Sequence, residues 1–171
     1  LAGLLGQTAV DAHMVMLSIA TFTFMSFPYG VATAAAVRVG NLVGAQQPAR
    51  ARAAASTCLA LGTGSMACFA VLIFAFRASL GSIFTPDAAV GALVARIAPV
   101  AALFQVADGF VGVSGGVLRG VGRQALSACV TIAAFWGRAV PLGAPPAFAA
   151  HPGVVPLWWG LAAGLVSAAP A

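Results

Sequence analysis

Long apolar runs bounded by charged residues constrain this sequence more than any other feature. A helix needs about 20 mostly apolar residues to cross the hydrocarbon core of a bilayer. Four runs reach that length, at residues 12–37, 53–76, 97–118 and 124–150. They are continuous, whereas membrane-spanning β-strands would alternate over short segments. The sequence therefore predicts an all-α fold, a polytopic transmembrane helical bundle with about four full spans.

Two partial helices flank these spans. Residues 1–8 are typical of the end of an earlier helix, and a truncated span begins near residue 156. That span opens with the aromatic pair Trp158 and Trp159, which suits the membrane interface. Because both ends look cut, we expect residues 1–171 to be one partial transmembrane lobe of a longer protein. We expect such a piece to be inactive alone.

Composition excludes several other classes of protein. Charged residues make up 6% of the sequence, against about a quarter in a typical soluble domain, so lipid is the expected solvent. The net charge of +5 comes from eight basic residues, all arginine, against three aspartates. These arginines stand between the apolar runs and do not cluster, which argues against a nucleic-acid partner. No metal-ligand spacing and no nucleophile–base pair is visible. We therefore expect no enzyme activity, no metal and no cofactor.

The arginines also predict the orientation in the membrane. The loop between the first two spans contains Arg38, Arg50 and Arg52, and the loop after the third contains Arg119 and Arg123. Two crossings separate these loops, so they lie on the same side, and neither contains an acidic residue. Cytoplasmic loops carry an excess of basic residues. Both loops are therefore predicted to be cytoplasmic.

Asp108 is the strongest candidate for a functional residue. It lies midway between Arg96 and Arg119, roughly 16 Å from either at the rise of an α-helix, and so near the middle of the membrane. An ionised group at that depth costs about 2.5–3.5 kcal/mol on insertion scales. Gln105 lies three residues earlier on the same helix face and could bind Asp108 or a ligand. We predict a coupling-ion or substrate site; the alternative is a structural acid neutralised by a neighbour.

Arg138 is a second charge within a predicted span. Counted from Arg123, it lies roughly 22 Å deep in a straight helix. It either extends outward to the interface or forms an intramembrane pair with Asp108. Since a short turn at 120–124 joins the two helices, we expect them to pack antiparallel, about 8–10 Å apart.

Small residues and prolines interrupt the apolar runs. Gly112, Gly116 and Gly120 form two overlapping GxxxG spacings, which allow a neighbouring helix to approach closely. Helix packing is the predicted use, and a wall beside a substrate cavity is the alternative. Pro28 and Pro99 lie inside spans, where they are expected to kink the helix.

Four motifs resemble one known family. Residues 37–50 contain RVGNLVGA followed by Pro-Ala-Arg, and residues 115–124 read GGVLRGVGRQ. These segments are similar to the RVGNxLGAG loop and the GVLRGxGxQ signature of multidrug and toxic compound extrusion (MATE) transporters. Residues 83–87, IFTPD, and 157–160, LWWG, are similar to two further motifs of that family, in the same order. The chain is identified as the family's C-terminal lobe, helices eight to eleven with parts of seven and twelve.

This resemblance implies a function. A MATE transporter has two lobes of six helices and exports drugs, metabolites and other small organic cationic or amphipathic solutes in exchange for protons or sodium. The expected partners are such solutes, the missing N-terminal lobe and the lipid bilayer, in either the plasma or the vacuolar membrane. Asp108 falls where eukaryotic members carry an acidic residue on helix ten, which implies a cation and proton site. Arg138 and the pair Pro145-Pro146 depart from the family, which has small or apolar residues there.

Two other functions remain as alternatives. One is a non-transporting membrane protein, a truncated product that survives as a scaffold. The other is a lipid or precursor flippase of related architecture. A flippase would need a continuous cationic cavity for an anionic headgroup, whereas this sequence has an acid at the predicted midplane.

Overall fold

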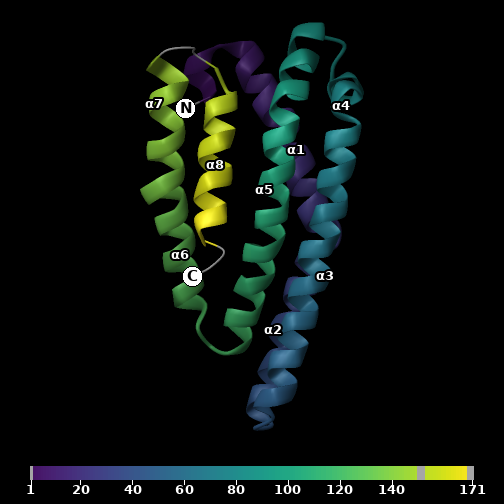
Figure 1. Ribbon diagram of the computed structural model, residues 1–171, viewed down its shortest axis with the longest axis vertical. Helices are drawn as coiled ribbons and strands as arrows, with labels where there is room; N and C mark the ends of the chain where they lie inside the picture. Colours follow the sequence, from purple (N-terminus) through teal and green to yellow (C-terminus); the bar gives the residue numbers. More distant parts are fainter. Residues whose placement is uncertain (1, 150–152, 169–171) are drawn as a thin grey trace.

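The computed structural model describes residues 2–149 and 153–168, and this part of the chain contains helices and no strands (Figure 1). The ends of the predicted domain, and residue 150 of the predicted fourth span, lie outside the described residues. The elements in chain order are η1 (Ala2–Leu5), α1 (Gln7–Ser26), α2 (Pro28–Gly44), α3 (Pro48–Ala75), α4 (Arg77–Phe84), α5 (Ala88–Gly120), α6 (Gln124–Ala134), η2 (Phe135–Ala139), α7 (Val140–Ala149) and α8 (Val155–Ala168).

Four helical segments of the described chain are long and apolar enough to cross a membrane. They are Gln7–Ser26, Pro48–Ala75, Ala88–Gly120 and Gln124–Phe148. The predicted all-α class is confirmed. The loop between α2 and α3 and the turn between α5 and α6 lie at the same end of the molecule in Figure 1, as the two crossings between them predict.

The predicted span 12–37 is not one kinked helix. It is divided between α1 and α2 at Phe27, whose φ of −141° and ψ of −50° are not helical. Pro28 is the first residue of α2, where a proline loses no helical hydrogen bond and its fixed φ suits the first turn. The proline thus ends one helix and starts the next, and the two helices extend beyond the predicted span at both ends.

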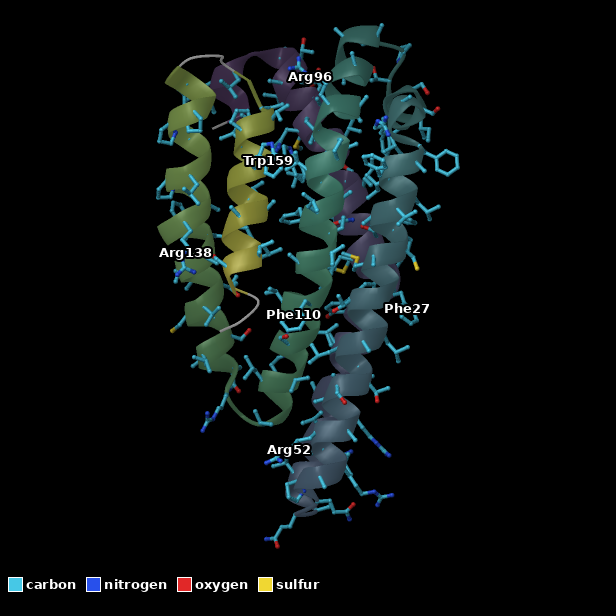
Figure 2. All side chains as sticks on the ribbon, viewed as in Figure 1. Phe27, Arg52, Arg96, Phe110, Arg138 and Trp159 are labelled. Carbon is cyan, nitrogen blue, oxygen red and sulfur yellow. The ribbon has the colours of Figure 1, made fainter. Side chains whose placement is uncertain are left out.

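Helix α5 is the longest element and begins earlier than the sequence predicts. Its start is Ala88 rather than residue 97, because the carboxylate of Asp87 accepts a hydrogen bond from the Ala89 N–H at 2.8 Å and caps the first turn. The helix continues through Pro99 to Gly120. Arg96, near the upper end of the molecule in Figure 2, is therefore a residue within a helix and not a loop boundary.

The fourth span contains a π-helical turn. Residues Phe135–Ala139 form η2, and the Val140 N–H donates to the Phe135 carbonyl five residues earlier. Helix α7 continues after this turn and contains Pro145 and Pro146 without a break among the described residues. This wider turn precedes a segment with three prolines, each of which lacks the backbone N–H that donates a hydrogen bond in a regular helix.

Helix α5 is the centre of the packing, in contact with α1, α2, α3, α4 and α8. Figure 1 shows α8 between α5 and the α6–α7 segment. The helices joined by the 120–124 turn run antiparallel, as expected, but they do not pack directly against each other along their whole lengths. They meet near their turn, and α8 occupies the space between them further along.

Glycines of α5 lie against neighbouring helices. A Cβ at Gly116 would lie 2.8 Å from the carbonyl carbon of Ala32, and one at Gly120 would lie 2.7 Å from the Ala36 oxygen. Both contacts are with the backbone of α2. A Cβ at Gly112 would instead meet the ring of Phe24, 2.6 Å from its Cζ. The spacing thus brings two glycines of α5 against α2 and the third against α1.

Candidate functional site

Asp108 lies within the apolar length of α5 and is half-buried. Its carboxylate forms no ion pair with any residue that the structure describes. An acid inside a membrane span is costly and is usually paired or directed at a wet cavity. Asp108 therefore has the surroundings of a group that is free to accept a cation or a proton.

Gln105 is fully buried, with 0% of its surface exposed, and connects α5 to α1. Its Nε2 donates to the hydroxyl oxygen of Thr23. That hydroxyl in turn donates to the carbonyls of Ile19 or Ala20, each 2.9 Å away. Gln105 Oε1 has no partner among the described residues. A buried unpartnered acceptor is unfavourable, so this amide oxygen is a candidate to accept a further hydrogen bond.

Thr23 was not identified from the sequence. It is buried, at 6% exposure, and is the partner of Gln105 across 82 positions of sequence. A threonine in an apolar helix usually bonds its own backbone, as this one also does. No local sequence pattern distinguishes a threonine whose hydroxyl also accepts a hydrogen bond from a side chain of another helix.

Trp158, the first tryptophan of the predicted interfacial pair, is buried inside the helical bundle. Its side chain is 0% exposed and makes edge contacts with His13 and Phe104, at ring-centroid distances of 5.7 and 5.8 Å. Trp159, the next residue along α8, is exposed. Adjacent residues of a helix point in different directions, so one tryptophan of the pair packs inside the bundle.

Arg138 is exposed on η2 and is not brought to Asp108. Its Nη1 donates to the Ser167 carbonyl of α8 at 3.4 Å. Because α8 lies between α5 and the segment that carries Arg138 (Figures 1 and 2), the guanidinium meets α8 first. The short connecting turn was the basis for expecting a direct pair, and chain order does not reveal the intervening helix.

Two apolar cavities lie along α5. One of about 550 Å³ is bounded by α3, α5 and α8, and Phe110 and Trp159 line it at different heights (Figure 2). The other, of about 250 Å³, lies toward α6 and is lined by Ser114, Gly115 and Thr131 among others. Neither is lined by Asp108, Gln105 or the three spaced glycines. Among the described residues no cluster of metal-ligating side chains occurs.

Comparisons with known proteins agree on one family. The MatE family model matches residues 1–144. "Multidrug resistance protein NorM" of Burkholderia vietnamiensis is 40% identical, over 98% of this chain and 37% of that protein. "Multidrug and toxin extrusion protein 2" of Mus musculus is 35% identical, over 94% of this chain and 28% of that protein.

A solved structure agrees with these relatives. The crystal structure of the eukaryotic MATE transporter AtDTX14 superposes with a TM-score of 0.87 at 28% identity, over 94% of this chain and 36% of that one. The chain thus spans about a third of the length of these relatives. Bacterial and eukaryotic members match with similar identity, so the likeness is not confined to the eukaryotic branch. This chain belongs to the MATE family of multidrug and toxin extrusion transporters, which are integral membrane proteins and not enzymes.

Proposed function

We propose that this chain forms one lobe of a secondary antiporter that exports organic cations in exchange for a proton or sodium. The observation that carries the proposal is Asp108, an acid within an apolar helix that has no counterion among the described residues. A single carboxylate that binds either a cationic solute or a small coupling cation cannot hold both. Mutually exclusive occupancy of one site is the simplest basis for exchange.

Gln105 supplies the second half of the proposed site. Its amide nitrogen is engaged by Thr23, which fixes the side chain, while Oε1 has no partner in the described part of the chain. Gln105 thus offers a fixed neutral oxygen one helical turn from the carboxylate of Asp108. Such a pair suits a hydrogen-bond donor or a small cation as ligand. The printed names of the relatives, which refer to multidrug resistance and toxin extrusion, support an organic solute as the exported partner.

Alternating access requires a second lobe that moves against the first around a site near the midplane. Since the chain spans about a third of its relatives, the proposal concerns the full-length transporter that contains it. The chain alone is proposed to be inactive. The missing N-terminal lobe of the same polypeptide is then its principal protein partner.

Asp108→Asn in the full-length transporter tests the proposal. Asparagine is nearly isosteric but carries no charge, so a loss of transport reports the lost charge. Asp87→Asn is the matched control, because it removes one negative charge outside the apolar region and asparagine also caps helices well. We expect Asp108→Asn to abolish gradient-driven export of a fluorescent organic cation while Asp87→Asn retains it. Export by Asp108→Asn at the rate of the unmodified transporter would remove Asp108 from the mechanism.

A further inference from the structure

A groove between α2 and α3 lies at the arginine-rich end of the molecule, where these two helices meet their connecting loop. Its volume is about 380 Å³. Arg38 of α2 and Arg50 in the first turn of α3 line its rim, and Thr57, Leu42, Ala53 and Cys58 line the remainder. Arg52, labelled in Figure 2, lies at the same end of the bundle.

The two arginines at the rim have no acidic partner among the residues that the structure describes. The aspartates of the sequence are Asp11, Asp87 and Asp108, and none of them lines the groove. Arg50 donates through Nη1 to Gln47 Oε1 at 2.9 Å, which orients the guanidinium and leaves its other donors free. Two guanidinium groups that line one groove, with no carboxylate among its lining residues, favour an anion with several oxygen acceptors, such as a phosphate.

The groove also lies at the depth of the membrane boundary. A Cβ at Gly40 would come within 3.1 Å of the Gly120 oxygen, so α2 just beyond Arg38 is level with the end of α5. From Ala53 to the end of α3 at Ala75 the residues are uncharged. Arg38 and Arg50 therefore lie near the ends of α2 and α3, where the apolar parts of these helices stop, which is the level expected for lipid phosphates.

The wall of the groove changes from charged to apolar along α3. Cys58 lies two helical turns past Arg50 toward the interior, roughly 12 Å along the axis. A soluble phosphate would use the arginines and leave this apolar wall uncovered. A phospholipid would use both, with its phosphate at the rim and its glycerol and first acyl carbons along Ala53, Thr57 and Cys58.

We propose that this groove binds the headgroup phosphate of an anionic phospholipid from the leaflet at the arginine-rich end. Anionic headgroups are attracted to basic pockets between transmembrane helices on the cytoplasmic side. The site is separate from the antiport proposal, because it lies near the ends of α2 and α3 whereas Asp108 lies near the predicted middle of the membrane, and its occupancy is measured without transport.

Cys58 provides a local probe of occupancy. The full-length transporter is placed in nanodiscs of phosphatidylcholine with increasing phosphatidylglycerol, and alkylation by N-ethylmaleimide is followed peptide by peptide. Phosphatidylglycerol is expected to slow the reaction of Cys58 and leave Cys68 and Cys129, which do not line the groove, unchanged. Cys129 follows Gln124 closely and so lies near the same leaflet. It therefore controls for a change in surface pH.

Paired substitutions separate the groove from general surface charge. Arg38→Gln with Arg50→Gln is expected to shift the midpoint of Cys58 protection to roughly thirtyfold more phosphatidylglycerol, because each basic residue contributes about 1 kcal/mol of attraction to an anionic membrane. Arg119→Gln with Arg123→Gln removes the same charge at the same end, outside the groove, and should leave the midpoint unchanged.

Three results would overturn the proposal. The first is equal reactivity of Cys58 with and without phosphatidylglycerol, which includes the case of a groove covered by another part of the polypeptide. The second is an equal loss of Cys58 protection in the two paired variants, which would mean that the general surface potential, and not the groove, causes the protection. The third is equal protection by soluble glycerol 3-phosphate in phosphatidylcholine nanodiscs, which would make the ligand a free phosphate and not a lipid.

Discussion

Gly116→Ala adds one methyl group where α5 meets the backbone of α2. The new carbon would lie 2.8 Å from the carbonyl carbon of Ala32 and 2.9 Å from its Cα, whereas ordinary contacts begin at 3.4 Å. The helices must separate by about half an ångström or more to relieve these contacts, since backbone atoms cannot rotate away. Overpacking costs about 1–3 kcal/mol, and a backbone clash belongs at the upper end of that range. Alanine regains about 1 kcal/mol of helix propensity.

The net expectation is a loss of about 2 kcal/mol in the free energy of unfolding. Gly64→Ala is the matched control, because a Cβ at that position of α3 meets nothing within 4 Å. It should be neutral or stabilising by about 0.5–1 kcal/mol. Both variants of the full-length transporter are unfolded with sodium dodecyl sulfate and followed by circular dichroism. Equal stability of Gly116→Ala and Gly64→Ala would refute the close approach of α5 and α2.

Three further predictions concern the polar residues and the topology. Thr23→Val should cost about 1–3 kcal/mol of stability in the same unfolding assay, because it leaves the buried amide of Gln105 without its acceptor. Thr23→Ser should keep the stability of the unmodified protein. A valine variant of unchanged stability would contradict the Gln105–Thr23 hydrogen bond. In a double-mutant cycle, Arg138→Leu and Asp108→Asn should have additive effects on stability, since α8 separates the two side chains; a coupling above about 0.5 kcal/mol would indicate that they pair. Single cysteines at Gln46 and Val121 should resist a membrane-impermeant reagent added to intact cells, and strong labelling from outside would reverse the orientation.

The spans were predictable because apolar length is a property of the sequence alone. The breaks and kinks within the spans were harder to predict. Pro28 signalled a perturbation, but a proline at the first position of a helix and a proline within a bend have the same local sequence. Pro99 illustrates the difficulty, because α5 passes through it without a break. The early start of α5 depends on the cap at Asp87, which hydropathy does not register.

The candidate site was predictable only in part. Asp108 and Gln105 could be selected because polar groups deep in an apolar run are unfavourable without a purpose. Their surroundings depend on which helices are neighbours, and chain order does not determine this. Thr23 was missed for that reason. The two alternatives for Arg138 stayed open because chain order does not reveal that α8 packs between two consecutive segments.

Separate ion gradients imposed on one preparation test the central claim most directly. The full-length transporter is reconstituted into vesicles, and the movement of a fluorescent organic cation is followed under a pH gradient alone, a sodium gradient alone, or neither. We predict accumulation of the solute against its own gradient under one of the two ion gradients, none without a gradient, and loss of the response in Asp108→Asn. Movement of the solute that is the same with and without both gradients would contradict an antiporter built around Asp108.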